Sequence, residues 1–352
     1  MRPAVWPRDD VLEERLLLID PAAGAFGDAR IRDFPSLLRP GDLLIVNDAA
    51  TVPASIAAEA RGRESEPVEI RLLALGEGES FSALVFGAGD WRSRTEDRPP
   101  PPALAAGDWL WVGGDLSAEV LKISPISPRI IELRFNKTGA DLWWALYRQG
   151  KPVQYSYLRA PLELWHTQTR YAARPWCVEA PSAGRPLTWS LLLEMGRRGV
   201  SLASLTHAAG LSSTGDPALD ALLPLPERFE IPAATVEAIR RTRAASGRVV
   251  AVGTTVVRAL EGCAAQNGGD LVAGAGIVDF IVRRGYSPRV VDGLFTGMHE
   301  PHASHFELLA AFADPSLIEA AYDRAERAGY LGHEYGDSNL ILSRASEAAI
   351  AA

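Results

Sequence analysis

Short, largely apolar runs recur in both halves of the chain and predict buried strands. They occur at residues 16–20, 43–46, 249–252 and 339–342, and a further strand is predicted at 201–207. Runs without alternation are typical of a sheet that helices cover on both faces. Between the runs, apolar residues recur at helical spacing, so the pattern predicts an α/β domain. The predicted helices span residues 34–38, 187–198 (capped by Thr188), 232–245, 304–312 and 318–328. A further apolar strand is predicted at 277–282.

Between residues 58 and 151 the pattern changes to alternating apolar and polar positions. The alternating segments, separated by glycine-rich turns, are 68–75, 80–86, 109–112, 118–126 and 129–135. This spacing predicts an antiparallel β-barrel or sandwich. The proline-rich segment 95–102 cannot join a sheet interior and is predicted to be a linker or exposed loop. We therefore expect an α/β main domain of residues 1–57 and 152–352 with an inserted β-barrel domain of residues 58–151.

The stretch 247–262, GRVVAVGTTVVRALEG, joins a predicted strand to a predicted helix through a tight turn. Gly253 ends the strand, and Thr254 or Thr255 is expected to cap the helix with a side-chain oxygen. The free N–H groups at the start of such a helix favour a carboxylate, a phosphate or a ring oxygen. The local pattern alone is equally that of an ordinary strand–helix unit.

Polar residues follow two of the predicted strands. Asn47 and Asp48 end the strand at 43–46, where α/β folds place binding groups, although the same residues also close turns. His207 ends the strand at 201–207, before a loop rich in glycine and serine. We weigh a structural role for His207 against a role in acid–base chemistry.

Composition and charge restrict the class of protein. Of the 352 residues, 47% are hydrophobic and 23% charged, as in a folded soluble protein. The net charge of −8 provides no overall electrostatic footprint for nucleic acid. Two cysteines, Cys177 and Cys263, suit a reducing cytoplasm. The N-terminal segment lacks the apolar core of a signal peptide, and no apolar run reaches about 18 residues. We expect a cytoplasmic monomer without a membrane partner.

Several common site motifs are missing. His299, Glu300, His302 and His305 do not have the H-E-x-x-H spacing, and Pro301 interrupts the helix that would align them. We therefore expect no metal. The sequence also lacks a Walker motif, a G-x-G-x-x-G turn and a G-x-S-x-G elbow.

Six stretches resemble motifs of one protein family, in the family's order and over nearly the whole chain. They are PGDLLIVNDAATVPA (40–54), QTRYA (168–172), EAPSAGRPLT (179–188), GRVVAVGTTVVRALEG (247–262), GYSPRVVDGLFTGMHEP (285–301) and YGDSNLIL (335–342). The GTT-x-VR-x-LE piece is specific. The chain is thus similar to the S-adenosylmethionine:tRNA ribosyltransferase-isomerases, the QueA family of the queuosine pathway. That family also has an α/β domain with an inserted β-barrel.

The resemblance implies a reaction and a co-substrate. The family transfers the ribosyl part of S-adenosylmethionine to a 7-aminomethyl-7-deazaguanine base in the tRNA anticodon and releases adenine and methionine. A base first removes a proton next to the sulfonium, so the site must be dry and must hold a general base. S-adenosylmethionine and tRNA are the implied partners, and no metal is implied.

The resemblance also implies site residues. Implied to contact the co-substrate are Asn47, Ala180, Pro181, Gly184, Gly253, Thr254, Thr255, Arg258, Tyr335 and Asp337. Arg258 is expected to pair with a carboxylate, either of the co-substrate or of Asp337. His207, His299 and Asp48 are the candidates for catalysis.

The chain departs from the family at several polar positions. Ala49–Ala50 replaces a Thr-Arg pair, 183–187 lacks a histidine, and 297–303 lacks a lysine. The lost cations weaken the case for contacts to an RNA backbone. Two alternatives therefore stay open: a divergent enzyme that uses S-adenosylmethionine on a small molecule, and a non-catalytic relative that binds a nucleoside or RNA.

Overall fold

The computed structural model describes residues 1–61, 65–75, 80–300 and 304–342. The strands are β1 (Arg2–Pro3), β2 (Arg15–Asp20), β3 (Ala25–Arg30), β4 (Leu43–Asn47), β5 (Ala49–Thr51), β6 (Ser55–Arg61), β7 (Ser65–Leu75), β8 (Ser80–Phe86), β9 (Trp109–Gly113), β10 (Leu116–Ile123), β11 (Ile130–Phe135), β12 (Arg174–Cys177), β13 (Ser201–His207), β14 (Glu227–Ile231), β15 (Val249–Val252), β16 (Gly274–Val278), β17 (Gly293–Gly297), β18 (Leu331–Gly332) and β19 (Ser338–Leu342). The α-helices are α1 (Phe34–Leu37), α2 (Gly139–Gln149), α3 (Leu164–Thr167), α4 (Trp189–Arg197), α5 (Pro217–Asp220), α6 (Ala233–Ala244), α7 (Thr254–Gln266), α8 (Ser304–Leu309) and α9 (Pro315–Arg327). Short 3-10 helices lie at η1 (Val11–Glu13), η2 (Ile31–Asp33), η4 (Thr95–Asp97) and η5 (Ser182–Gly184).

A mixed sheet of nine strands forms the larger part of the molecule. Its order is β16-β14-β13-β4-β15-β17-β19-β2-β3. The central strands β13, β4, β15 and β17 run parallel, as do β19 and β2, whereas the strands at both edges pair antiparallel with their neighbours. The predicted α/β main domain is confirmed, with antiparallel edges added to its parallel centre.

Alternate residues of the central strands pack on opposite faces of this sheet. Leu43 and Ile45 of β4 belong to one core cluster, together with residues of α6, α7 and α9. Leu44 and Val46 belong to a second cluster, together with residues of α1 and α4. Because both faces are covered, every position of β4 is buried, which explains the unbroken apolar run in the sequence.

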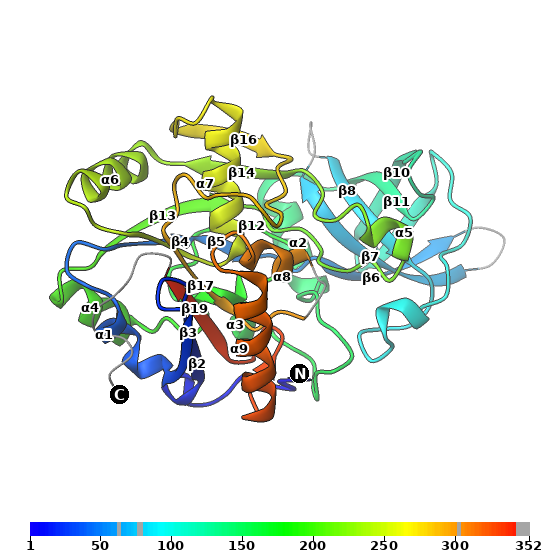
Figure 1. Ribbon diagram of the computed structural model, residues 1–352. Helices are drawn as coiled ribbons and strands as arrows, with labels where there is room; N and C mark the ends of the chain where they lie inside the picture. Colours follow the sequence, from blue (N-terminus) through cyan, green and yellow to red (C-terminus); the bar gives the residue numbers. More distant parts are fainter. Residues whose placement is uncertain (62–64, 76–79, 301–303, 343–352) are drawn as a thin grey trace.

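The alternating segments form a closed antiparallel barrel of β6 to β11, which lies at one end of the molecule (Figure 1). The chain enters and leaves the barrel side by side, because Ser55 and Lys151 exchange backbone hydrogen bonds of 2.9 and 2.8 Å. The barrel therefore inserts into the main domain as predicted. The exact domain boundaries stay a prediction.

One detail of the sequence prediction is wrong, and another is refined by the structure. The strand expected at 277–282 is β16, which ends at Val278, because Phe280 and Val282 pack into the core from a loop. The proline-rich segment 95–102 is anchored rather than wholly exposed. In this segment Arg98 is buried, pairs with Glu69 at 2.5 Å, and donates to the carbonyl of Gly87 at 2.8 Å. The pattern of polar residues in this segment could not reveal the anchor, because the partner of Arg98 is Glu69, which lies on the barrel strand β7.

An ion pair ties the start of β15 to the start of β4. Asp42 and Arg248 are both fully buried, and the Arg248 Nη2 and Asp42 Oδ2 atoms are 2.6 Å apart. The backbone N–H of Leu43 donates to the carbonyl of Arg248 at 2.8 Å. These bonds set the register of the two strands whose other ends form the site.

No described helix is long and apolar enough to cross a membrane. The expected monomeric state stays a prediction.

Candidate active site

A cavity of about 860 Å³ lies at the carboxyl ends of the central strands, beside the barrel. This is the edge where open α/β sheets bind ligands. Seven of the residues predicted for the site line it, namely Ala180, Pro181, Gly253, Thr254, Thr255, Arg258 and His299. The cavity lies within the size range of sites for small molecules.

The turn between β15 and α7 forms one wall of the cavity. Gly253 has a φ of 89°, which a residue with a side chain rarely adopts, and a Cβ there would lie 3.3 Å from the Ala183 Cβ. Helix α7 begins directly at Thr254 with Gly253 as its N-cap. The predicted threonine cap is therefore wrong, because the glycine conformation starts the helix without a side-chain acceptor. Thr254 and Thr255, the first residues of α7, line the cavity, and binding of a ligand by their N–H groups stays a prediction.

Arg258, one turn into α7, pairs with Glu227 of β14 rather than with Asp337. Glu227 also accepts a bond of 2.7 Å from the backbone N–H of Gly210. Burial raises the pKa of Glu227, and the adjacent Arg258 guanidinium opposes that shift. Among the described residues, the Arg258 Nη2 atom is buried without a hydrogen-bond partner, so this cation can still bind an acceptor in the cavity.

His207 lies behind this pair and does not line the cavity. Its Nε2 atom is 3.3 Å from the Glu227 Oε2 atom. Complete burial, together with the charge of Arg258, lowers the pKa of His207 to about 3. The ring is therefore neutral near pH 7. It can position Glu227 but reaches a ligand only through that carboxylate.

The amide of Asn47 connects the ends of two strands with helix α7. Its oxygen accepts from the N–H of His207 at 2.9 Å, and its nitrogen donates to the carbonyl of the same residue at 2.9 Å. The amide nitrogen also lies 3.4 Å from the Thr255 hydroxyl. Asn47 thus supports Thr255 from outside the cavity. This arrangement explains why an amide, rather than a charge, ends β4.

His299 lines the cavity from the segment after β17. Its Nε2 atom lies 2.9 Å from the Thr296 hydroxyl, and its ring stacks on His305 with centroids 5.3 Å apart. Burial lowers the pKa of His299 to about 3 and that of His305 to about 4. Both rings are neutral near pH 7 and can accept a proton or a hydrogen bond.

Two carboxylates of the cavity were missed by the sequence prediction. Glu179 accepts a hydrogen bond from the Tyr155 hydroxyl and one of 3.0 Å from the N–H of Ser212. Burial raises the pKa of Glu334 to about 7, and its Oε2 atom has no hydrogen-bond partner among the described residues. The preceding residue, His333, has a φ of 67°, which places Glu334 on a strained turn. Glu179 is the first residue of the motif at 179–188 and Glu334 directly precedes the motif at 335–342, and this was the only signal in the sequence.

Carboxylates outnumber cations around the cavity. Its lining contains six acidic residues, Glu96, Glu179, Asp220, Glu227, Glu300 and Glu334, and two arginines, Arg94 and Arg258. Such a lining favours a ligand that carries positive charge. No group of histidine, cysteine and acidic residues within the described ranges could hold a metal ion. His302, one of the histidines considered above, lies outside those ranges.

Besides His207 and Asn47, four further predicted residues lie outside the cavity lining. Gly184 is needed for packing, because a Cβ there would lie 2.0 Å from the Tyr171 hydroxyl. The Asp48 carboxylate accepts from the Ser204 and Thr206 hydroxyls at 3.0 and 2.6 Å.

The other two hold the N-terminal segment and the turn after β18. Tyr335 packs in a small core cluster with Ala4. Asp337 accepts from Arg8 at 2.7 Å and from the backbone N–H groups of Arg15 and Leu331 at 2.8 Å. Tyr335 and Asp337 match family motifs, and both support the segments beside the cavity. That either residue contacts a ligand stays a prediction.

Known proteins resemble this chain over nearly its whole length. A sequence model of the family described as "Queuosine biosynthesis protein" matches residues 3–341. The S-adenosylmethionine:tRNA ribosyltransferase-isomerase of Pelobacter propionicus is 34% identical over 346 residues, 96% of this chain and 95% of that protein. The protein of the same name from Thermus thermophilus is 36% identical over 322 residues, 89% of this chain and 88% of that protein.

A solved structure has a similar fold. The crystal structure of S-adenosylmethionine tRNA ribosyltransferase from Thermotoga maritima has a TM-score of 0.52 and 24% sequence identity to this chain. The likeness covers 97% of this chain and 96% of that one.

Proposed function

Because the chain belongs to the queuosine biosynthesis protein family, we propose that its large cavity performs the reaction for which the relatives are named. The protein is a transferase and isomerase that moves the ribosyl part of S-adenosylmethionine to tRNA. The acceptor is a 7-aminomethyl-7-deazaguanine base, and adenine and methionine leave. The names of the relatives favour a tRNA acceptor over a small molecule or a non-catalytic role.

One observation supports this function most directly: carboxylates surround a cavity that the start of α7 closes. S-adenosylmethionine, when bound, supplies the ribosyl group and a positive sulfur that acidifies the neighbouring carbon. The acidic lining suits this sulfonium and also the aminomethyl group of the acceptor. The unpartnered nitrogen of Arg258 and the free N–H groups of Thr254 and Thr255 suit a carboxylate or ribose oxygens.

The candidate groups for acid–base work come from two segments of the cavity wall. His299 is neutral and lines the cavity, but its pKa of about 3 makes it a weak base near pH 7, so its part in catalysis stays a prediction. Glu334 has its pKa near neutral pH, where a group both takes and returns protons efficiently. His207 lies behind Glu227, with its Nε2 atom 3.3 Å from the Glu227 Oε2 atom, and its part in acid–base chemistry stays a prediction. A catalytic role of Asp48 stays a hypothesis. The alternative is a structural role, in which its carboxylate accepts the hydrogen bonds from Ser204 and Thr206.

Turnover with defined substrates tests the proposed function. The protein is incubated with S-adenosylmethionine and either tRNA that carries the deazaguanine base or tRNA with ordinary guanine. We expect adenine and methionine to appear in equal amounts only with the first tRNA. Release without tRNA would instead identify a small-molecule acceptor or hydrolysis. Binding of S-adenosylmethionine without any release would support the non-catalytic alternative.

A further inference from the structure

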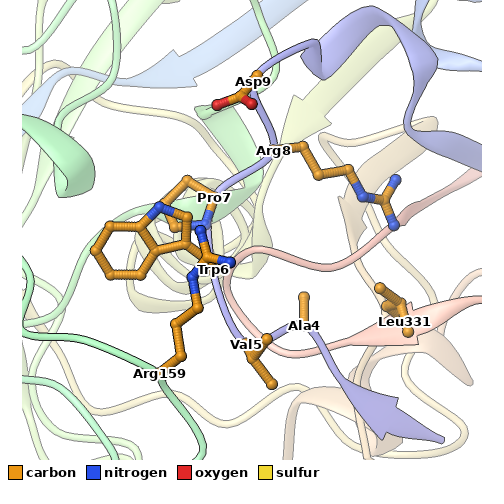
Figure 2. A pocket seen from close by; sticks show the side chains of 8 residues that line it. All are labelled: Ala4, Val5, Trp6, Pro7, Arg8, Asp9, Arg159 and Leu331. Carbon is orange, nitrogen blue, oxygen red and sulfur yellow. The ribbon is translucent and has the colours of Figure 1, made fainter.

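A second, smaller hollow of about 370 Å³ lies beside the large cavity (Figure 2). Its walls are largely apolar and come from Ala4, Val5, Trp6, Pro7 and Leu331. The other lining residues, Arg8, Asp9 and Arg159, are charged. Figure 2 shows the Trp6 ring and Arg159 on one side of the hollow and Arg8 on the other, with Asp9 at the rim.

Three segments contribute to both hollows. The N-terminal segment lines the large cavity with Met1 and Pro3 and the small hollow with Ala4 and the residues after it. Tyr157 lines the large cavity and Arg159 the small hollow. Leu331 lines the small hollow and His333 the large cavity. Because two residues of extended chain span about 7 Å at most, the two hollows are close neighbours.

The shared segments are held firmly. Strand β1 pairs in parallel with β18, so residues 2–3 lie beside residues 331–332. The backbone N–H of Arg159 donates to the carbonyl of Val5 at 3.0 Å. Asp337 fixes Arg8 by an ion pair of 2.7 Å. The position of the small hollow relative to the large cavity is therefore set by backbone pairing rather than by side chains alone.

Trp6 and Arg159 form the chemically distinctive wall of the small hollow. The Arg159 guanidinium lies 5.4 Å from the centre of the Trp6 ring. Arg159 is exposed, and no ion pair within the described ranges involves it. Arg8 is only partly exposed, and its charge is already paired with Asp337. The guanidinium lies over the Trp6 ring, and the His166 ring meets the same indole edge to face at 5.0 Å. A tryptophan with a guanidinium that no described ion pair occupies is a combination that binds single-stranded nucleic acid by stacking and phosphate contact.

We propose that the small hollow binds one nucleotide of the RNA substrate, adjacent to the nucleotide whose base reacts in the large cavity. The base of this nucleotide stacks on Trp6, and its phosphate lies against Arg159. This inference rests on the proposed function, because it takes the substrate to be RNA. It also accounts for the charge distribution: the large cavity is acidic and unsuited to phosphates, whereas the hollow beside it offers a cation without a carboxylate partner.

Direct RNA binding tests the inference independently of turnover. The probe is a fluorescently labelled RNA stem-loop that carries 7-aminomethyl-7-deazaguanine in its loop, and anisotropy gives the Kd over a range of salt concentrations. We expect Trp6→Ala to raise the Kd about tenfold and Trp6→Phe to recover most of the affinity. Arg159→Ala should raise the Kd at low salt and flatten the slope of log Kd against log salt by about 0.7, the loss of one phosphate contact.

Matched variants on the main domain control for unspecific effects. Trp189→Ala removes an exposed tryptophan at the start of α4, and Arg240→Ala removes an exposed arginine of α6. Both should bind the RNA as the unchanged protein does. All variants should bind S-adenosylmethionine with unchanged Kd in calorimetry, which also shows that Trp6→Ala is folded.

Two results would overturn the inference. One is equal RNA affinity and salt slope in Arg159→Ala and the unchanged protein. The other is equal loss in the Arg159 and Arg240 variants, which would indicate unspecific attraction. Failure of the proposed function looks different: the unchanged protein would release no adenine with the modified RNA, whatever the small hollow binds.

Discussion

Neutral buried histidines link the site to the stability of the protein. His207 is fully buried, and its pKa falls from the ordinary value of 6.5 to about 3. The unfolded chain binds a proton below pH 6.5, whereas the folded protein does so only near pH 3. The contribution of neutral His207 to stability is therefore fully present above pH 6.5 and is lost as the pH falls toward 3. His299 and His305 contribute in the same direction.

Protonation of His207 in the unfolded chain should by itself lower the free energy of unfolding by about 2 kcal/mol when the pH falls from 7 to 5. Urea unfolding of the unchanged protein and of His207→Gln at both pH values measures this contribution. The variant should lose about 2 kcal/mol less than the unchanged protein over this interval. Equal pH dependence of the two proteins would show that His207 is charged, or exposed, in the folded state.

Glu334 gives the opposite pH dependence. Burial raises its pKa from 4.5 to about 7, so the folded protein keeps a proton that the unfolded chain releases. Its contribution to stability falls as the pH rises from 4.5 to 7. Glu334→Gln has no such proton to release. Between pH 5 and pH 8, its free energy of unfolding should therefore rise by about 2 kcal/mol relative to that of the unchanged protein. A constant difference between the two proteins at both pH values would contradict this assignment.

At the scale of elements, the turn that starts α7 connects backbone conformation with ligand binding. Gly253→Ala forces a side chain into a φ of 89° and toward the Ala183 Cβ. We expect a loss of about 1–3 kcal/mol in the free energy of unfolding and weaker binding of S-adenosylmethionine. Gly268→Ala is the control, because Gly268 follows α7 with a φ of 68° and has open space around its Cβ position. It should lose stability but bind S-adenosylmethionine normally in calorimetry.

The register of β4 and β15 depends on the buried pair of Asp42 and Arg248. Asp42→Asn keeps the shape of the side chain and removes the carboxylate charge that faces the buried Arg248 guanidinium. We expect a loss of about 3–5 kcal/mol in urea unfolding. Glu194→Gln, which removes an exposed partner of Arg197 and Arg198, should cost less than 1 kcal/mol. Similar losses in the two variants would show that the Asp42 pair is hydrated.

The sequence predicts elements well where burial leaves a periodic trace. The strands β4, β15 and β19 lie where apolar runs predicted them, because both faces of each strand are covered. The cap of α4 at Thr188 is confirmed by its bond to the N–H of Leu191. The predicted threonine cap of α7 was wrong, because the backbone conformation of a glycine leaves no side-chain pattern in the sequence.

Partners that are distant in sequence could not be predicted. Asp42 and Arg248, which form the buried ion pair, are 206 positions apart in the sequence. The pair of Arg258 with Glu227, and the acidic lining as a whole, depend on which loops the sheet brings together. Seven of the thirteen residues that the family motifs implied line the cavity. The motifs did not separate residues that face the cavity from those, such as Gly184 and Asp337, that support it.

At the scale of the whole molecule, the barrel is a closed unit with its own core. We expect a fragment of residues 52–153 to fold by itself, because its ends are joined by the pairing of Ser55 with Lys151. The fragment loses contacts with Leu211 and Leu219, so it should be less stable than the barrel in the full chain. Dispersed amide signals in NMR and a cooperative thermal transition would confirm the predicted domain division, and a disordered fragment would refute it.

The position of β19 has a consequence for the order of events during synthesis. This strand, Ser338–Leu342, lies between β17 and β2 and pairs with both. The barrel strands, by contrast, all lie between Ser55 and Phe135. A ribosome therefore releases a barrel that can close early, while β2, made before it, waits for a neighbour that follows all the other described strands. Until then the edges of β2 and β17 are open, and a nascent chain stalled late in translation is the form of this protein most exposed to aggregation.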